Sequence, residues 1–266
     1  MRSQLGASTR LDEIVARRRD RLAEAKRALP LAKLEERSAA APRLRDFAAA
    51  LTRDGLNVIA ELKRASPTRG LLRAAYNPAA LAPALEQAGA AALSVLTEEE
   101  FFQGSLEDLT LVRQLVRTPV LRKDFLFDPY QLFEARAAGA DAFLLIAAIL
   151  SPQELRLLIT LGQQLGMAAL VEIHRHAELD PALAAGARII GVNNRNLKTF
   201  EVDVGTSARL IEAIPDDRIA VSESGLKRRS ELERLRTAGF DAFLVGEHLM
   251  QAADPAVALR ALLAGT

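Results

Sequence analysis

The sequence of 266 residues contains no cysteine. Without a thiol, the chain cannot form disulfide bonds, use a thiol nucleophile, or hold zinc or an iron–sulfur cluster through cysteine. It also lacks an excess of charge of either sign, because 35 Lys and Arg stand against 34 Asp and Glu and give a formal net charge of +1. No overall basic field favours nucleic acid, and we expect no nucleic-acid partner.

A long apolar run is missing as well. The longest runs, such as AFLLIAAIL at residues 142–150, fall well short of the roughly 20 residues required to span a bilayer. The N-terminal segment MRSQLGASTRLDEIVARRRD alternates charged and apolar residues and lacks the apolar core of a signal peptide. These features predict a cytoplasmic protein with no membrane partner. The hydrophobic content of 50% is sufficient for a large folded core.

The first fifty residues have a helical pattern. Thr9 and Asp12 have the spacing of a helix-capping box. Pro30 and Pro42 interrupt the segment, which predicts two or three short helices. We interpret the three arginines at residues 17–19 as part of a solvated helix face. Residues 1–50 are predicted to be a helical extension packed on a single domain, residues 51–266.

From residue 57 onwards, short apolar runs rich in β-formers alternate with segments of helical composition. The eight runs, in order, are NVIAEL, AALSVL, PVLRKDF, AFLLIA, AALVEI, RIIGVNN, RIAVSES and AFLVG. Four of the helical segments end in a glycine, at positions 89, 139, 186 and 239, as expected where a helix ends with left-handed backbone angles. Eight strands alternating with helices predict a parallel sheet, and eight is the number that closes a barrel with a filled interior.

An open doubly wound sheet is the alternative fold. It would usually carry a glycine-rich phosphate loop after its first strand, whereas the residues found there, ELKRASPTRG, match neither the dinucleotide nor the P-loop pattern. The prediction is therefore an α/β protein, a single (β/α)8 TIM barrel with an N-terminal helical extension.

Polar residues stand at the C-terminal ends of the predicted strands, where barrel enzymes have their active sites. In strand order they are Glu61, Lys63, Lys123, Glu172, Asn193, Arg195, Glu223, Ser224, Gly225, Gly246 and Glu247. Any one of them can simply mark the point where the chain meets water. Lysines and glutamates gathered in one concave mouth, however, supply an acid and a base at one pH, which suits proton transfer at a carbonyl or enamine of an anionic substrate.

The ends of the seventh and eighth strands match the place where barrels commonly bind phosphate. Ser224, Gly225 and Gly246 allow the backbone to approach a ligand closely. An inward-pointing Glu247 carboxylate would repel phosphate, so only its backbone N–H is expected to contribute.

Three aromatic or histidine features have less specific interpretations. His174 and His176 form an H-x-H pair without a third ligand at a recognisable spacing, so we predict no metal site. Phe101 and Phe102 are interpreted either as packing under a lid or as a platform for a ring. His248 is interpreted as a surface or packing residue.

Seven segments resemble, in order, the motifs of the indole-3-glycerol phosphate synthase family. They are AELKRASPTRG (60–70), SVLTEEEFFQGS (94–105), VLRKDFLFDPYQ (120–131), ALVEIH (169–174), IIGVNNRNL (189–197), VSESGL (221–226) and FLVGEHLM (243–250). The similarity spans most of the chain, the N-terminal extension included. It implies a decarboxylating ring closure in tryptophan biosynthesis, in which 1-(2-carboxyphenylamino)-1-deoxyribulose 5-phosphate loses CO2 and water.

The resemblance implies a role for each catalytic residue. Lys123 corresponds to the general acid that protonates the ribulose carbonyl, and Lys63 to the lysine that pairs with the anthranilate carboxylate. Glu172 corresponds to the general base of the final step, with Glu61 orienting the lysines and Asn193 contacting the substrate hydroxyls. No cofactor is expected, because decarboxylation restores an aromatic ring.

The same resemblance implies the residues that bind substrate. Arg195 would contact the substrate hydroxyls together with Asn193, Phe102 would line the ring pocket, and Ser66 lies in the mobile loop after the first strand. The implied strand-seven and phosphate residues are Glu223, Ser224, Gly225, Gly246 and the backbone of Glu247. The partner is then a small phosphorylated substrate, and the protein is expected to be a monomer or a weak homodimer.

Two other functions are alternatives. Phosphoribosylanthranilate isomerase, a related barrel, would require a Cys/Asp acid–base pair, and this chain has no cysteine. A barrel that binds a metabolite without turnover would not need both lysines and both glutamates.

Many family members have Ser or Thr in place of Glu247, which leaves the side-chain part of the phosphate site open.

Overall fold

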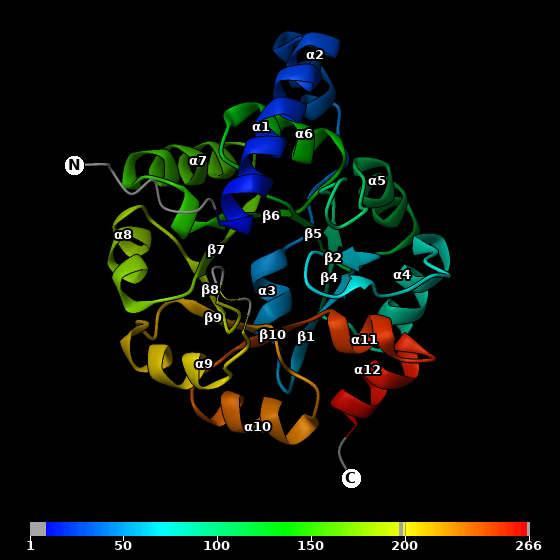
Figure 1. Ribbon diagram of the computed structural model, residues 1–266, viewed down its shortest axis with the longest axis vertical. Coiled ribbons are helices and arrows are strands. Elements are labelled where there is room, and N and C mark those ends of the chain that lie inside the picture. Colours follow the sequence, from blue (N-terminus) through cyan, green and yellow to red (C-terminus); the bar gives the residue numbers. More distant parts are fainter. Residues whose placement is uncertain (1–8, 197–198, 200, 265–266) are drawn as a thin grey trace, which may run out of the picture.

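The computed structural model describes residues 9–196, 199 and 201–264. Within these ranges, eight parallel strands form a closed barrel in the order β1-β10-β9-β8-β7-β6-β5-β4 (Figure 1). The strands are β1 (Asn57–Leu62), β4 (Ala92–Leu96), β5 (Val120–Lys123), β6 (Ala142–Ile146), β7 (Ala168–Ile173), β8 (Ile189–Asn193), β9 (Ile219–Glu223) and β10 (Ala242–Val245). Each corresponds to one of the predicted apolar runs, so the predicted barrel is confirmed.

Helices surround the barrel, one or more after each strand (Figure 1). They are α4 (Pro78–Gln87), α5 (Leu106–Leu115), α6 (Pro129–Ala137), α7 (Pro152–Gln164), α8 (Leu179–Ala184), α9 (Gly205–Leu210), α10 (Arg229–Thr237), α11 (Glu247–Gln251) and α12 (Pro255–Leu263), with short 3-10 turns η1 (Ala147–Ile149), η2 (His176–Glu178) and η3 (Ile211–Ala213). The four glycines predicted to end helices all have positive φ, between 92° and 115°. The part of the chain that the structure describes contains no helix that is both long and apolar enough to cross a membrane.

Alternation along the strands separates two layers of the core. Val58, Ala60 and Leu62 of β1 pack outwards against the helices. Ile59 belongs to the inner cluster, which also holds Leu121 of β5 and, from the opposite side of the barrel, Leu170 of β7. The last inward position is polar on β1, β5, β7, β8 and β9, and there the filled interior gives way to the site described below.

The N-terminal extension comprises α1 (Arg10–Ala28), α2 (Leu31–Ala39) and α3 (Phe47–Leu51). The predicted capping box is confirmed, because the Asp12 backbone N–H donates to Thr9 Oγ1 at 3.2 Å and the Thr9 N–H donates to Asp12 Oδ2 at 2.9 Å. The helices were expected to be short, but α1 has 19 residues. Proline first interrupts the pattern at Pro30, so nothing stops α1 earlier.

One arginine of the triplet at 17–19 was misinterpreted. Arg17 and Arg19 are exposed, whereas Arg18 is buried and donates to Asp124 Oδ2 at 2.7 Å. The solvated-face interpretation is therefore wrong for Arg18. Its partner follows Lys123 in the chain, so no local pattern revealed the contact.

The extension contacts the barrel interior. Phe47 and Leu51 of α3 join the inner cluster, and Figure 1 shows α3 at the centre of the ring of strands. Ile14 of α1 joins the same cluster together with Phe125, a residue that lines the mouth. The division into an extension and a barrel at residues 50 and 51 stays a prediction; the boundary falls within α3.

The first and last strands close the barrel. β1 pairs with β10 in a register that places Asn57 beside Ala242. The Asn57 side-chain amide donates to the carbonyls of Leu51, Arg53 and Asp241, at 2.8 to 3.1 Å. One buried amide thus fastens α3 to both ends of the barrel sequence.

Candidate active site

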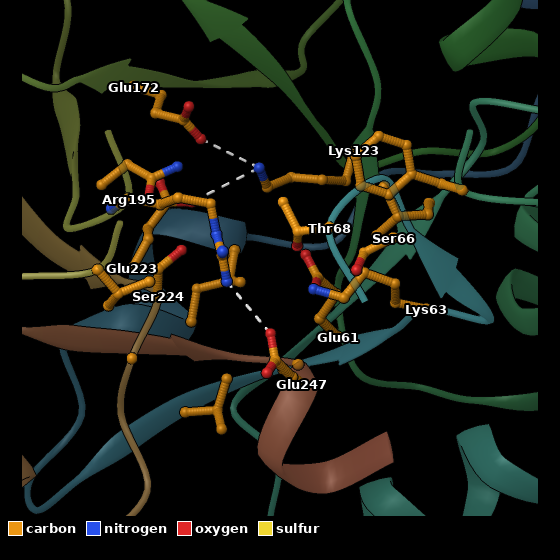
Figure 2. A pocket seen from close by; sticks show the side chains of 18 of the residues that line it. Glu61, Lys63, Ser66, Thr68, Lys123, Glu172, Arg195, Glu223, Ser224 and Glu247 are labelled. Carbon is orange, nitrogen blue, oxygen red and sulfur yellow. Dashed lines mark hydrogen bonds and ion pairs between the residues drawn. The ribbon is translucent and has the colours of Figure 1, made fainter. Parts of the chain in front are cut away.

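A pocket of about 580 Å³ opens at the C-terminal ends of the strands, a volume suited to a small-molecule ligand. Figure 2 shows several of its charged side chains pointing toward one another. Every residue predicted for the site lines this pocket: Glu61, Lys63, Ser66, Phe102, Lys123, Glu172, Asn193, Arg195, Glu223, Ser224, Gly225, Gly246 and Glu247. All of them therefore lie at the end of the barrel where the strands finish.

Lys123 ends β5 and stands between two carboxylates. Its Nζ donates to Glu172 Oε2 at 3.0 Å and lies 3.6 Å from Glu223 Oε2, as Figure 2 shows. Burial by itself would lower the pKa of Lys123, but the charges of Glu172, Glu223 and Glu61 outweigh it and raise that pKa above its usual value. The ammonium group is therefore charged at neutral pH.

Glu172 is the last inward residue of β7 that the barrel buries. Burial would raise the pKa of this carboxyl group, but Lys123 and His174 reverse the direction and lower the pKa below its usual value. His174 Nε2 lies 3.2 Å from Glu172 Oε1, and His174 Nδ1 lies 3.7 Å from Glu178 Oε2. Burial disfavours the charged imidazole, yet the contacts with these two carboxylates raise the pKa of His174 to about 9.

The pKa of Glu223, at the end of β9, is shifted in the opposite direction from that of Glu172. Burial and then the nearby charge of Glu172 raise the pKa of Glu223 to about 8. Its Oε1 atom has no hydrogen-bond partner among the residues that the structure describes. Gly191 of β8 makes room for it, because a Cβ at that position would lie 2.2 Å from Glu223 Oε1. The pKa values of Glu223 and Glu172 are therefore shifted in opposite directions.

A second acid–base pair ends β1. Lys63 Nζ lies 2.6 Å from Glu61 Oε1, and both side chains are largely buried. Gly246 allows this placement, since a Cβ there would lie 2.1 Å from Glu61 Oε1. Two of the ammonium groups in the mouth, those of Lys63 and Lys123, are thus each held by at least one carboxylate.

The turn after β9 has strained backbone. Ser224 has φ of 68° and Gly225 has φ of 82°, and a non-glycine residue seldom adopts such angles. Asn194 holds this turn, because its side-chain amide donates to the Ser224 carbonyl at 3.1 Å and to Ser222 Oγ at 3.3 Å. Ser207 completes this buried network by donating its backbone N–H to Asn194 Oδ1 at 3.0 Å. The strained residue Ser224 thus lies in the predicted phosphate-binding turn.

Glu247 points into the pocket (Figure 2). Its Oε2 accepts from Arg195 at 3.1 Å, and its Oε1 lies 3.2 Å from Arg69 Nε. An inward carboxylate was expected to repel phosphate. Here the positive charges of Arg69 and Arg195 compensate the negative charge of Glu247.

The loop after β1 and the loop after β4 form the remaining wall. The β1 loop contains a short hairpin, β2 (Ala65–Ser66) and β3 (Gly70–Leu71), which the sequence did not predict. Phe102 lines the pocket with its ring centroid 6.2 Å from that of Phe125, whereas Phe101 lies under the guanidinium of Arg10. The two aromatic residues therefore divide between the pocket and the extension.

The extension also contributes to the site. Leu11 and Ile14 of α1 line the pocket. Arg18 of the same helix binds Asp124. Burial by itself would raise the pKa of Asp124, but the charges of Arg18 and Arg122 outweigh it, and the pKa is lower than usual. Asp124 also accepts from Thr97 Oγ1 at 2.6 Å. The residue after Lys123 is thus fixed from three sides.

Several contributors were missed by the sequence analysis. His174 was considered only as a metal ligand, although its position two residues after Glu172 was a usable signal. His248 was interpreted as a surface or packing residue and lines the pocket. Asn194 and the pairing of Arg69 with Glu247 had no local signal, because their partners lie far away in sequence.

Comparison with known proteins shows the family. A sequence model described as indole-3-glycerol phosphate synthase matches residues 11–262. The indole-3-glycerol phosphate synthase of Chlorobium chlorochromatii is 49% identical over 91% of this chain and 95% of its own length. That of Rhodopirellula baltica is 46% identical over 96% of this chain and 99% of its own.

Solved structures resemble the fold at low sequence identity. 3-Hexulose-6-phosphate synthase from Salmonella typhimurium has a TM-score of 0.64 at 13% identity and covers 78% of this chain and 96% of its own. Thiamine phosphate pyrophosphorylase from Pyrococcus furiosus has a TM-score of 0.60 at 18% identity, over 78% of this chain and 93% of its own. At these identities the likeness concerns the barrel alone.

Proposed function

The chain belongs to the indole-3-glycerol phosphate synthase family, and on that premise we propose that Lys123 is the general acid of ring closure and Glu172 the base of the last step. The reaction closes 1-(2-carboxyphenylamino)-1-deoxyribulose 5-phosphate to indole-3-glycerol phosphate, with loss of CO2 and water, in tryptophan biosynthesis. The enzyme is a decarboxylating, ring-closing lyase.

The observation that carries this assignment is the buried contact of Lys123 with Glu172, at 3.0 Å in the centre of the mouth. As the ring carbon bearing the carboxylate attacks the ribulose carbonyl, negative charge develops on the carbonyl oxygen. An ammonium group placed there donates a proton and stabilises that charge. The carboxylates around Lys123 keep this donor charged until the more basic alkoxide forms.

Lys63 is proposed to hold the anthranilate carboxylate at the other side of the ring. Its contact with Glu61, at 2.6 Å, limits how strongly it neutralises the carboxylate that must leave as CO2. After CO2 has left, Lys63 is positioned to protonate the departing hydroxyl group during dehydration. Division of the two acid roles in this way matches the two separate lysine–glutamate pairs.

Transfer of the Lys123 proton prepares the last step. Charged Lys123 has the largest effect among the groups that lower the pKa of Glu172. Once Lys123 becomes neutral, that attraction is lost and the basicity of Glu172 increases. Glu172 then accepts the proton whose removal completes the aromatic indole, while His174 remains in contact.

The rest of the pocket is proposed to hold the substrate in place. Asn193 and Arg195 face the ribulose hydroxyls, with the Arg195 N–H held by Asn193 Oδ1 at 2.9 Å. Phe102 lines the ring end and Ser66 lies in the adjacent loop. The proposed phosphate site consists of the turn after β9 and the start of α11: Ser224, Gly225, Gly246 and the Glu247 backbone N–H.

We also propose that the enzyme needs no cofactor, acts in the cytoplasm, and binds neither nucleic acid nor membrane. The large exposed apolar side chains recorded on helices are spread over α2, α5, α7 and α12, which supports a monomer or a weak homodimer. Sedimentation over a range of concentrations tests the oligomeric state.

The central test mixes the purified protein with the carboxyphenylamino-deoxyribulose phosphate, without metal or nucleotide, and follows indole fluorescence. A folded Lys123→Ala variant is measured beside it. Turnover by the parent and near-loss in the variant support both the reaction and the acid. Binding of the substrate without turnover by the parent would favour a non-catalytic barrel.

A further inference from the structure

The Glu247 carboxylate lies at the end of the pocket where the substrate's phosphate group, a second anion, is proposed to bind. We propose that Glu247 is a built-in counter-anion of the phosphate site: it holds Arg69 and Arg195 in the free protein and yields them to the arriving phosphate. This inference rests on the proposed function for the location of the phosphate site, and it assigns to the Glu247 side chain a role that the backbone assignment leaves open.

The geometry supports such an exchange. Glu247 presents one oxygen to each arginine, Oε2 to Arg195 at 3.1 Å and Oε1 to Arg69 at 3.2 Å. The Glu247 side chain is 18% exposed and that of Arg195 is 23% exposed, so the pair lies in the wall of the pocket. Figure 2 shows this carboxylate directed into the cavity toward Arg195. Its own backbone starts α11 directly after Gly246.

A carboxylate and a phosphate monoester bind the same kinds of cationic side chain. Both accept hydrogen bonds from guanidinium groups through paired oxygens, and the phosphate carries more charge and more acceptor oxygens. The two anions repel each other within one cavity. Phosphate therefore competes with Glu247 for the arginines, and part of its binding energy is spent on displacing the carboxylate.

The exchange also links the phosphate site to the loop after β1. Arg69 belongs to the turn between β2 and β3, and its side chain is 60% exposed. The Arg69 N–H donates to Ser66 Oγ at 3.2 Å within that loop. Glu247 thus anchors the loop in the free protein, and the phosphate replaces it as the anchor in the complex.

The deciding experiment measures binding of inorganic phosphate to the parent and to Glu247→Gln by calorimetry, at constant ionic strength set with chloride. The substitution keeps the shape and removes the charge, so we expect phosphate to bind about tenfold more tightly, the effect of one nearby unit charge at intermediate dielectric. Glu201→Gln is the matched control. Glu201 lines the same pocket, but its side chain accepts from Thr199 Oγ1 at 3.2 Å, and we expect little change.

A second measurement separates competition at the phosphate site from a general change of charge. The substrate without its phosphate still carries the anthranilate carboxylate. Its affinity is expected to be the same in the parent and in Glu247→Gln, whereas KM for the phosphorylated substrate falls in parallel with the Kd for phosphate. An equal gain for both ligands would overturn the proposal.

Weaker or unchanged phosphate binding by folded Glu247→Gln, or no phosphate binding by either protein, would also overturn it. These outcomes are independent of catalysis. Tighter phosphate binding without turnover by the parent would leave this inference standing and reject the proposed catalytic roles. Turnover by the parent with unchanged phosphate binding would do the reverse.

Discussion

Replacement of Lys123 by alanine tests the arrangement of the whole mouth. The variant loses a proton donor and leaves Glu172 with the contact to His174 at 3.2 Å. Loss of one donor that acts in the transition state costs about 3–4 kcal/mol, or roughly 10²- to 10³-fold in kcat. KM is expected to change far less, because Lys123 is assigned to the transition state rather than to binding.

The same substitution changes stability in a pH-dependent way. Breaking a buried ion pair costs about 3–5 kcal/mol when the remaining charge has no partner, and the contact of Glu172 with His174 lowers that cost in Lys123→Ala. Without Lys123 the pKa of Glu172 rises, and a carboxyl group whose folded-state pKa is raised contributes stability at low pH and loses it as the pH increases. Lys123→Ala should therefore be closer to the parent in stability at pH 5 than at pH 8.

The assay is single-turnover indole fluorescence, with urea unfolding at both pH values as the measure of folding. Lys227→Ala is the control, because Lys227 also lines the pocket and has no proposed role in the reaction. A folded Lys123→Ala enzyme whose kcat stays within about tenfold of the parent would refute the assignment. The acid of ring closure would then have to be sought at Lys63.

Three further predictions concern the groups around this lysine. The pKa of Glu223 is about 8, and its ionised form would make Lys123 a weaker proton donor, so kcat of the parent should fall above pH 8. The pH–rate profile of Glu223→Gln should be flatter in that range. An alkaline limb that is the same in both proteins would count against this prediction. Gly191→Ala pushes a Cβ to within 2.2 Å of Glu223 Oε1, so kcat should fall by about 10²-fold, as expected for a displacement near 1 Å, with normal circular dichroism. Arg18→Met removes the 2.7 Å contact with Asp124 and should lower the unfolding free energy by about 3 kcal/mol together with kcat; loss of stability alone would limit Arg18 to a structural role.

The barrel was predictable because its signals are local. Each strand is a short apolar run, and each of four helices ends at a glycine whose positive φ the structure confirms, as at Gly89 and Gly139. The hairpin after β1 escaped prediction because its strands are only two residues long. Arg18 escaped because its sequence neighbours are solvated and its partner lies 106 positions away.

For the site, alternation along each strand indicated which residues share the mouth. It could not indicate which side chains touch across the barrel, because that depends on the register of strands far apart in the chain. The raised pKa of Glu223 and the pairing of Arg69 with Glu247 follow from such contacts. The sequence therefore predicted which residues line the mouth, whereas the shifts of their pKa values required coordinates.

Pairing of β1 with β10 has a consequence for synthesis on the ribosome. At about 5–20 residues per second, the edge of β1 waits many seconds for its partner, whose pairing begins at Ala242. Until then that edge is open to other strands, and Asn57 lacks the Asp241 carbonyl that it binds in the finished fold. Glu61 lies in β1 and Lys63 follows it directly, whereas Glu247 comes directly after β10 and Gly246. The mouth therefore acquires its full set of charges only when the last strand docks. Nascent chains stalled before residue 242 should consequently be inactive and dependent on chaperones.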